Sequence, residues 1–341
     1  MDDPDPTGDD RARIKPGGAA AWLACLASLL VLGCGPKRPD RIAVIPQTEG
    51  NMIWEAAHVG AEEAAHRYGA FIYWNAPTRE DDVEAQIALV DRVVAQGYQG
   101  LVLAPDQALA LMTPVRRAVS RGIPTVVIGS ALAMPPEGNL FYILNDDEAG
   151  GRVAAKRVGE LLHGTGTVAL LGIDPDLTGI MIRTRAFEQT LAQDYPGIRI
   201  VEKRMGSFNF PHEQQAAQDA IDSHPDLDAI VALMATTVDG TLSALNSVSN
   251  GHRIVVIGFD VASPPLFNRN PGLNCVIQED TRSMGEKAVA LILAKLRGGS
   301  VAREMKIEPL VITSENLDSS AVRHMWSQDW TLGHSPWSPI Q

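Results

Sequence analysis

The chain has 341 residues, a mass of 36.6 kDa and a formal net charge of −12, from 41 acidic and 29 basic residues. This length supplies enough apolar side chains for two modest lobes or one large α/β domain. No run of lysine and arginine is long enough to form the concentrated basic face that binds nucleic acid phosphates. These properties argue against a small disulfide-stapled scaffold and against a nucleic-acid partner.

The N-terminal segment predicts a lipoprotein signal peptide. Three basic residues precede an apolar or small stretch, 19–32, that is shorter than the roughly 20 residues of a membrane-spanning helix. The letters "VLGC" at 31–34 resemble a bacterial lipobox, so residues 1–33 would be removed, Cys34 would carry the lipid and residues 34–40 would form a tether. Five aspartates among the first ten residues leave the translation start open, and a buried N-terminal helix is the alternative interpretation.

From residue 41 onward, short β-branched runs alternate with amphipathic stretches. The predicted strands are "RIAVIP" (41–46), "FIYW" (71–74), "GLVLAP" (100–105), "PTVVIG" (124–129), "LFYIL" (140–144), "TVALLGI" (167–173), "IRIVEKR" (198–204), "AIVALM" (229–234), "RIVVIGFD" (253–260) and "LNCVIQ" (273–278). Strands that are apolar at nearly every position and separated by helices indicate parallel sheets covered on both faces. Two helices are predicted with their buried faces: 52–68 through Trp54, Ala57, Ala61, Ala65 and Tyr68, and 82–96 through Val83, Ile87, Val90 and Val94.

The repetition of strand and helix in both halves predicts two similar α/β lobes, with the second starting near Asn145. Ligands of such sheets bind at the carboxyl ends of the strands. The loops that leave those ends carry "PQTEGN", "APDQ", "GSAL", "DPDLT", "ATTVD" and "DVAS".

Motifs of catalysis are missing from the sequence. It has no P-loop, no nucleophile elbow, no H-E-x-x-H and no paired C-x-x-C, and its eight histidines are scattered. The acidic pairs at 81–82 and 146–147 stand beside predicted helix starts and are interpreted as caps. Cys275 is interpreted as a small core residue. We therefore expect no enzymatic activity, no cofactor and no metal site.

The order of these motifs resembles the type I periplasmic binding proteins, the ribose-binding and LacI-like sugar-binding family of ABC importers. The resemblance rests on "RIAVIPQTEGNMIWEAAHVGAEEAAHRYGA", "QGYQGLVLAPDQ", "RGIPTVVIGS", "ILNDDEAGGRVAA", "HPDLDAIVALMATTVDGTLSAL" and "IVVIGFD". It implies an α/β fold of two Rossmann-like lobes, each with a parallel sheet, joined by three crossovers. The implied divisions are an N-terminal lobe of 41–144 plus 280–308, a C-terminal lobe of 145–279 plus 309–325, and a tail of 326–341.

The family's pocket sandwiches a sugar between aromatic rings and surrounds its hydroxyl groups with polar side chains. The positions of this chain that match that pocket are Asn51, Ile53, Trp54, Ser130, Arg183, Phe208, Met234, Asp260 and Glu279, with Gln278 as the alternative to Glu279. Three of these residues also have simpler explanations. Trp54 fits a helical core position, Asp260 fits a helix cap, and Arg183 fits a surface ion pair.

Several positions depart from the family's pattern. Gly129 and Ser130 stand where Asp followed by Arg or Ser is usual, and Met234 and Ala235 replace the usual Asn-Asp pair. These changes remove groups that bind hydroxyls. The resemblance therefore points away from a common pentose or hexose and toward a more apolar or differently substituted ligand.

The expected function is a monomeric, lipid-anchored solute-binding protein on the periplasmic or extracytoplasmic face of the cell envelope. It would capture a small polar ligand, a carbohydrate or a derivative, by hinge closure and deliver it to an ABC permease. One alternative is a lipoprotein that reports ligand occupancy to a membrane receptor. Another is a LacI-like regulator core, which requires a DNA-binding domain where this chain has an apolar run and a lipobox.

Overall fold

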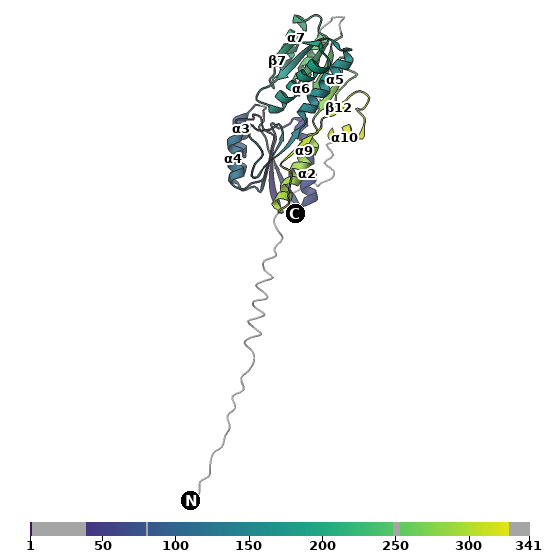
Figure 1. Ribbon diagram of the computed structural model, residues 1–341. Helices are drawn as coiled ribbons and strands as arrows, with labels where there is room; N and C mark the ends of the chain where they lie inside the picture. Colours follow the sequence, from purple (N-terminus) through teal and green to yellow (C-terminus); the bar gives the residue numbers. More distant parts are fainter. Residues whose placement is uncertain (2–38, 80, 248–252, 327–341) are drawn as a thin grey trace. The chain divides into compact units, whose positions relative to one another are not determined.

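The computed structural model describes residues 1, 39–79, 81–247 and 253–326, and the described residues from 40 to 326 belong to one compact unit (Figure 1). The predicted signal peptide, Cys34, most of the tether and nearly all of the tail lie outside the described residues. Within the described ranges, no helix combines the length and the apolar character needed to cross a bilayer.

The first sheet is entirely parallel and has the strand order β11-β5-β4-β3-β1-β2. Its strands are β1 (Asp40–Ile45), β2 (Ala70–Trp74), β3 (Gly100–Leu103), β4 (Thr125–Gly129), β5 (Leu140–Asn145) and β11 (Glu304–Ile307). Side chains of successive strand residues point to opposite faces, so Ile42 and Val44 pack under α2 (Met52–Tyr68) and α9 (Thr281–Leu296). Ala43 and Ile45 pack under α3 (Val83–Ala95) and α4 (Met112–Ser120) on the other face.

The second sheet has the order β12-β10-β9-β8-β6-β7, with only β12 antiparallel. Its strands are β6 (Thr165–Ile173), β7 (Gly197–Met205), β8 (Ala229–Ala232), β9 (Val255–Phe259), β10 (Leu273–Gln278) and β12 (Leu310–Ile312). Helices α5 (Asp147–Leu161) and α6 (Thr178–Asp194) cover one face. The other face packs against α7 (Phe210–Ser223), α8 (Ala235–Ser247) and α10 (Ser320–Trp326).

The chain passes between the two sheets three times, after β5, after β10 and after β11. This confirms the predicted α/β class with two parallel-sheet lobes and three crossovers. The crossing after β10 sends α9 back to the first sheet, where it packs along α2.

Glycine permits a close approach of helices beside each sheet. A Cβ atom on Gly60 of α2 would lie 2.0 Å from the carbonyl oxygen of Arg282, and one on Gly285 of α9 would lie 2.1 Å from that of Ala57. A Cβ atom on Gly151 of α5 would lie 2.2 Å from the carbonyl oxygen of Arg183 in α6. The two helix pairs therefore pack backbone to backbone, which fixes the helix starts that face the ligand side of each sheet.

The structure differs from the sequence prediction in local details. Strands β11 and β12 were not predicted, and β8 ends at Ala232 instead of Met234. The 52–68 helix is confirmed, but Tyr68 on its predicted buried face is 39% exposed. Tyr68 occupies the last turn, where the guanidinium of Arg297 lies 5.8 Å from its ring centroid. Val83 and Ile87 are only half-buried, whereas Val90 and Val94 are buried as predicted.

Candidate functional site

A cavity of about 90 Å³ lies where the carboxyl ends of strands from both sheets face each other. Residues from both halves of the chain line it. Its lining contains all nine residues singled out from the sequence: Asn51, Ile53, Trp54, Ser130, Arg183, Phe208, Met234, Asp260 and Glu279. Seven further residues complete it: Gln47, Gly129, Leu177, Ile180, Leu233, Ala235 and Thr236.

On the first-sheet side, the start of α2 positions three lining residues. Asn51 is the N-cap, and its Oδ1 accepts a hydrogen bond from the backbone N–H of Ile53 at 3.0 Å. The hydroxyl of Thr281 in α9 donates to the carbonyl oxygen of Ile53 at 2.6 Å. Trp54, in the first turn, belongs to the core cluster between α2, α9 and the sheet, and it is 6% exposed. Trp54 therefore serves both the core and the cavity wall.

The last residue of β4 is Gly129, so this strand end places no side chain in the cavity. Its φ of 76° is in the left-handed region, which strains other residues. A Cβ atom there would also lie 3.6 Å from Cη2 of Trp54. The wall at this point is therefore formed by the indole ring and by Ser130, the next residue.

On the second-sheet side, the wall is largely apolar. Met234, in the turn between β8 and α8, is 5% exposed and belongs to the core between the second sheet, α5 and α6. Phe208, in the loop between β7 and α7, is half-buried and packs against the same core. β8 ends early because Leu233 and Met234 leave the sheet to line the cavity. Phe208 and Trp54 thus provide one aromatic ring from each half of the chain.

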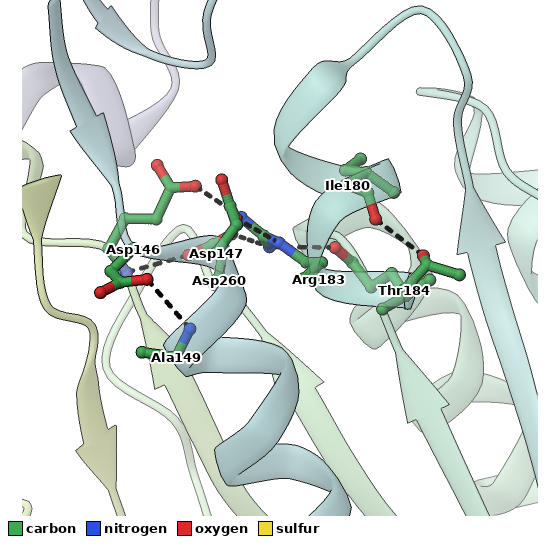
Figure 2. Close-up of polar contacts among 9 residues, drawn as sticks. Asp146, Asp147, Ala149, Ile180, Arg183, Thr184 and Asp260 are labelled. Atoms are coloured by element: carbon green, nitrogen blue, oxygen red, sulfur yellow. Dashed lines mark hydrogen bonds and ion pairs between the residues drawn. The ribbon is translucent and has the colours of Figure 1, made fainter. Parts of the chain in front are cut away.

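The floor of the cavity is an ionic cluster centred on Arg183 of α6. Figure 2 shows its guanidinium reaching between Asp147, at the start of α5, and Asp260, after β9. Nε donates to Oδ1 of Asp147 at 2.7 Å, one terminal nitrogen donates to Oδ2 of Asp260 at 2.9 Å, and the other donates to Oε1 of Glu279 at 2.9 Å. Arg183 is 4% exposed, so it is not a surface ion pair.

Two further contacts complete the surroundings of this guanidinium. The carbonyl oxygen of Leu233 accepts a hydrogen bond from Arg183 at 3.3 Å, and Oδ1 of Asp147 lies 2.6 Å from the nitrogen that also contacts Glu279. The ring of Phe259 lies under the guanidinium, 4.7 Å from its central carbon. A guanidinium has five N–H groups, and five contacts to protein oxygens are present.

Asp260 is held by contacts other than helix capping. Its φ of 55° places it in the left-handed region. Oδ1 accepts the backbone N–H of Glu279 at 3.0 Å while Oδ2 accepts from Arg183. The side chain therefore ties the loop after β9 to the loop after β10.

Crowding of acids around one cation shifts the ionisation of the cluster. Burial raises the pKa of Glu279 to about 8; the charge of Asp260 adds to this effect and that of Arg183 opposes it. Burial likewise raises the pKa of Asp147, against the opposing effect of Arg183. Burial acts to lower the pKa of Arg183, but the three carboxylates raise it above its ordinary value, so the guanidinium stays charged.

Gln278 and Glu279, the two alternatives at the end of β10, differ in what they contact. Gln278 is 2% exposed, and its Oε1 accepts the backbone N–H of Val261 at 2.9 Å, which makes it part of the protein interior. Glu279, the next residue, faces the cavity. Because side chains alternate along a strand, Gln278 at the end of β10 points into the interior and the next residue, Glu279, points the other way, toward the cavity.

The acidic pairs had been interpreted as caps, and this holds for only one member of each. Asp146 caps α5 by accepting the N–H of Ala149 at 3.0 Å, and Asp82 caps α3 in the same way. Asp147 instead binds Arg183, and Asp81 has a φ of 66°. One N-cap needs only one side chain. The second acid before the helix was therefore the sequence signal that Asp147 has a role other than capping.

Within the described ranges, no group of three or more His, Cys, Asp and Glu side chains has a geometry that could hold a metal ion. Cys275 is buried in the core between the second sheet and helices α5 and α6, as expected.

The sequence matches the family described as "Periplasmic binding protein domain" over residues 42–300. It is 25% identical to the D-ribose/D-allose-binding protein of Pseudomonas aeruginosa over 254 residues, which cover 71% of this chain and 78% of that protein. It is 26% identical to the xylitol-binding protein of Mycolicibacterium smegmatis over 319 residues, covering 91% and 88% of the two chains.

The fold is also similar to solved structures. An ABC transporter solute-binding protein from Agrobacterium vitis, bound with α-D-tagatopyranose, superposes with a TM-score of 0.77 at 23% identity, covering 84% of this chain and 98% of that one. A carbohydrate transporter solute-binding protein from Agrobacterium radiobacter in complex with D-arabinose gives a TM-score of 0.78 at 20% identity, covering 85% and 100%.

Proposed function

This chain belongs to the periplasmic binding protein domain family, and on that premise we propose that it is the solute-binding component of an ABC importer. Its ligand would be a carbohydrate or a carbohydrate derivative. The relatives that bind ribose, allose and xylitol support this class of ligand. The function requires binding and release, without covalent chemistry.

The observation that carries the proposal is the cavity lined from both halves of the chain. One aromatic ring and one group of polar side chains come from each side, which suits a sugar's apolar face and its hydroxyl rim. The departures at Gly129, Met234 and Ala235 make the wall more apolar than the family's pattern. A cavity of about 90 Å³ favours a single small ring over an oligosaccharide.

The proposed mechanism is closure of the two halves over the ligand. Hydrogen bonds already cross from one half to the other beside the cavity. The hydroxyl of Thr178 donates to the carbonyl oxygen of Ala131 at 3.1 Å, and the N–H of Ala108 donates to the carbonyl oxygen of Asp176 at 3.2 Å. A ligand that contacts both halves adds its own bonds only in this closed arrangement, so it shifts the population toward it.

The proposed lobe boundaries follow the sheets. The N-terminal lobe, 41–144 plus 280–308, contains α9 and the strands of the first sheet apart from the end residues Asp40 and Asn145. The C-terminal lobe, 145–279 plus 309–325, contains those of the second. The three connections between the sheets would be the hinge.

A ligand screen tests the function. The full chain, purified in a mild detergent, is heated with monosaccharides, polyols and their derivatives, and a ligand is expected to raise the unfolding temperature by several degrees. Asp260→Ala should abolish the shift, whereas Asp91→Ala, which removes an exposed ion pair with Arg117, should leave it intact. A shift that survives both Asp260→Ala and Trp54→Ala would show that the ligand binds elsewhere.

The proposal places the protein on the extracytoplasmic side, held by a lipid on Cys34 and acting as a monomer next to its permease. Cys34 and the "VLGC" motif lie outside the described residues, so this part rests on the sequence. The test is Cys34→Ser, which should move the protein from the detergent phase to the aqueous phase on phase separation. Unchanged partitioning of the variant would contradict the anchor.

A further inference from the structure

The floor of the cavity holds more buried acid than its one cation balances. The side chains of Asp147, Asp260 and Glu279 are 5%, 10% and 15% exposed, and all three contact Arg183. With every carboxyl ionised, three negative charges against one positive charge give the cluster a formal charge of −2. Excess charge that is shielded from water is costly and attracts a compensating cation or proton.

Arg183 has little donor capacity left for a ligand, because four of its five N–H groups donate hydrogen bonds and Asp147 lies close to the nitrogen that carries the fifth. Its three nitrogens make five contacts with oxygens of Asp147, Leu233, Asp260 and Glu279. The groups of the cluster that are best able to bind a ligand are therefore the carboxylate oxygens of Asp260 and Glu279, which accept hydrogen bonds and carry negative charge.

The rest of the lining brings no second cation. Among the described residues of the wall, the other polar side chains are neutral: Gln47, Asn51, Ser130 and Thr236. The remaining wall is apolar or glycine. The carboxylates therefore dominate the electrostatic potential of the cavity.

The mouth of the cavity is also acidic. Burial raises the pKa of Asp81, and the charges of Asp174 and Asp176, which come from the other half of the chain, raise it further. Glu49, Arg79 and Asp81 line a depression beside the cavity, and the Arg79 side chain is 81% exposed. Such an arrangement favours the approach of a cation over that of an anion.

We propose that the ligand carries a protonated amine that lies against Glu279 and Asp260, so that its class is an amino sugar or an aminated polyol. This inference rests on the proposed function and names its ligand class. An ammonium group donates three hydrogen bonds and neutralises part of the excess charge. The carbon face of the same ring would pack between Trp54 and Phe208.

A bound proton is the competing way to balance the cluster. Because burial raises the pKa of Glu279 to about 8, the protonated form of this carboxyl is favoured at pH 7 in the absence of a ligand. An ammonium group that pairs with Glu279 displaces that proton to the buffer. A neutral sugar leaves the proton in place, since the carboxylic acid can donate to one of its oxygens. Proton release on binding therefore separates the two ligand classes.

The test uses D-glucosamine, D-galactosamine and D-mannosamine, each beside its parent hexose and its uncharged N-acetyl derivative. Binding to the full chain is measured by calorimetry at pH 7 in two buffers of different ionisation enthalpy. An amine is expected to bind at least about tenfold more tightly than its two neutral counterparts and to release about one proton. Glu279→Gln should reduce that preference to less than about threefold and abolish the proton release. Glu84→Gln, an exposed acid on α3, is the matched control and should change neither.

Two outcomes would overturn the inference. The first contradicts only the amine, and the second also contradicts the proposed function. If a neutral hexose binds as tightly as its amine without releasing a proton, the amine proposal is wrong and the proposed function stands. If none of the nine compounds binds, and the broader carbohydrate screen also finds no ligand, both are wrong. An amine preference that persists in Glu279→Gln would likewise contradict the assigned contact.

Discussion

A Cβ atom on Gly151 would lie 2.2 Å from the carbonyl oxygen of Arg183, so α5 and α6 touch through their backbones one turn beyond Asp147. This contact sets how far the guanidinium reaches toward the carboxylates. The same two helices supply the most deeply buried ion pair of the cavity floor, between Arg183 and Asp147. Helix packing and cavity electrostatics therefore depend on the same glycine.

Gly151→Ala is expected to lower the free energy of unfolding by about 1–3 kcal/mol, because the backbone of α6 must move. The helix propensity of alanine offsets up to about 1 kcal/mol of this cost. Urea unfolding measures the difference. Gly150→Ala is the matched control, since its nearest contact is a ring carbon of Phe259 at 3.2 Å. Equal stability of the two variants would contradict the backbone contact.

Arg183→Met is expected to destabilise the fold by about 3–5 kcal/mol at pH 8, because three carboxylates lose their counter-ion. Burial raises the pKa values of Asp147 and Glu279, and the loss of the opposing guanidinium strengthens this effect, so protonation at pH 5 should restore part of the loss. Chemical unfolding at the two pH values measures this recovery. Arg117→Met removes an exposed pair with Asp91 and should cost at most about 1 kcal/mol at either pH. A loss that does not depend on pH would count against the charged cluster.

Glu279→Gln should change how stability varies with pH. The pKa of Glu279 is raised from 4.5 to about 8, so the folded protein binds more protons than the unfolded chain between these values. The stabilising effect is fully present below about pH 4.5 and is lost as the pH rises toward 8. The variant should lack this decline and should therefore gain, relative to the natural chain, on the order of a few kcal/mol between pH 5 and pH 8.5.

Urea unfolding at pH 5 and pH 8.5 measures the free energy of unfolding of the natural chain, of Glu279→Gln and of the control Glu84→Gln. Asp147 also has a raised pKa, but it is present in both proteins and so affects both. An identical pH dependence in the natural chain and in Glu279→Gln would show that Glu279 holds no extra proton.

Trp54 should report ligand binding by its fluorescence. Its indole ring lines the cavity, so a bound ligand displaces water from it and changes its emission. Trp54→Phe should remove the change while keeping most of the core packing, whereas Trp54→Ala also opens a cavity at a cost of about 3–5 kcal/mol. Trp74→Phe is the control, because Trp74 does not line the cavity. Its ring stacks on that of His58, with 4.1 Å between the ring centroids. A ligand-induced change that persists in Trp54→Phe would place the reporting residue elsewhere.

The sequence predicted the repeating elements well because their signals are local. The ten predicted strands and the helix at 52–68 follow from apolar runs and periodicity. Strands β11 and β12 were missed because each is short and half-buried, and their strand conformation comes from pairing with β5 and β10. Such pairing brings together residues more than 30 positions apart, which no local pattern reveals.

The residues around the cavity could be named from the sequence, but their contacts could not. The resemblance to the family placed Arg183 among the positions that match the ligand pocket. The structure shows its N–H groups engaged by acids from the start of α5, the loop after β9 and the loop after β10. These contacts arise only when three segments meet in the fold. The binding role of each lining residue stays a prediction until a ligand is found.

The place of α9 has a consequence for how the molecule can be made and cut. Met284, Ala288 and Ile292 of α9 complete the core over Ile42 and Val44, although some 240 residues of chain separate the two sets. A growing chain therefore cannot finish the half it began first until almost all of it has been synthesised. For the same reason, no single cut yields two self-sufficient pieces. A fragment ending at Gln278 would hold five of the six strands of each sheet but would leave the apolar face of α2 without α9 to cover it.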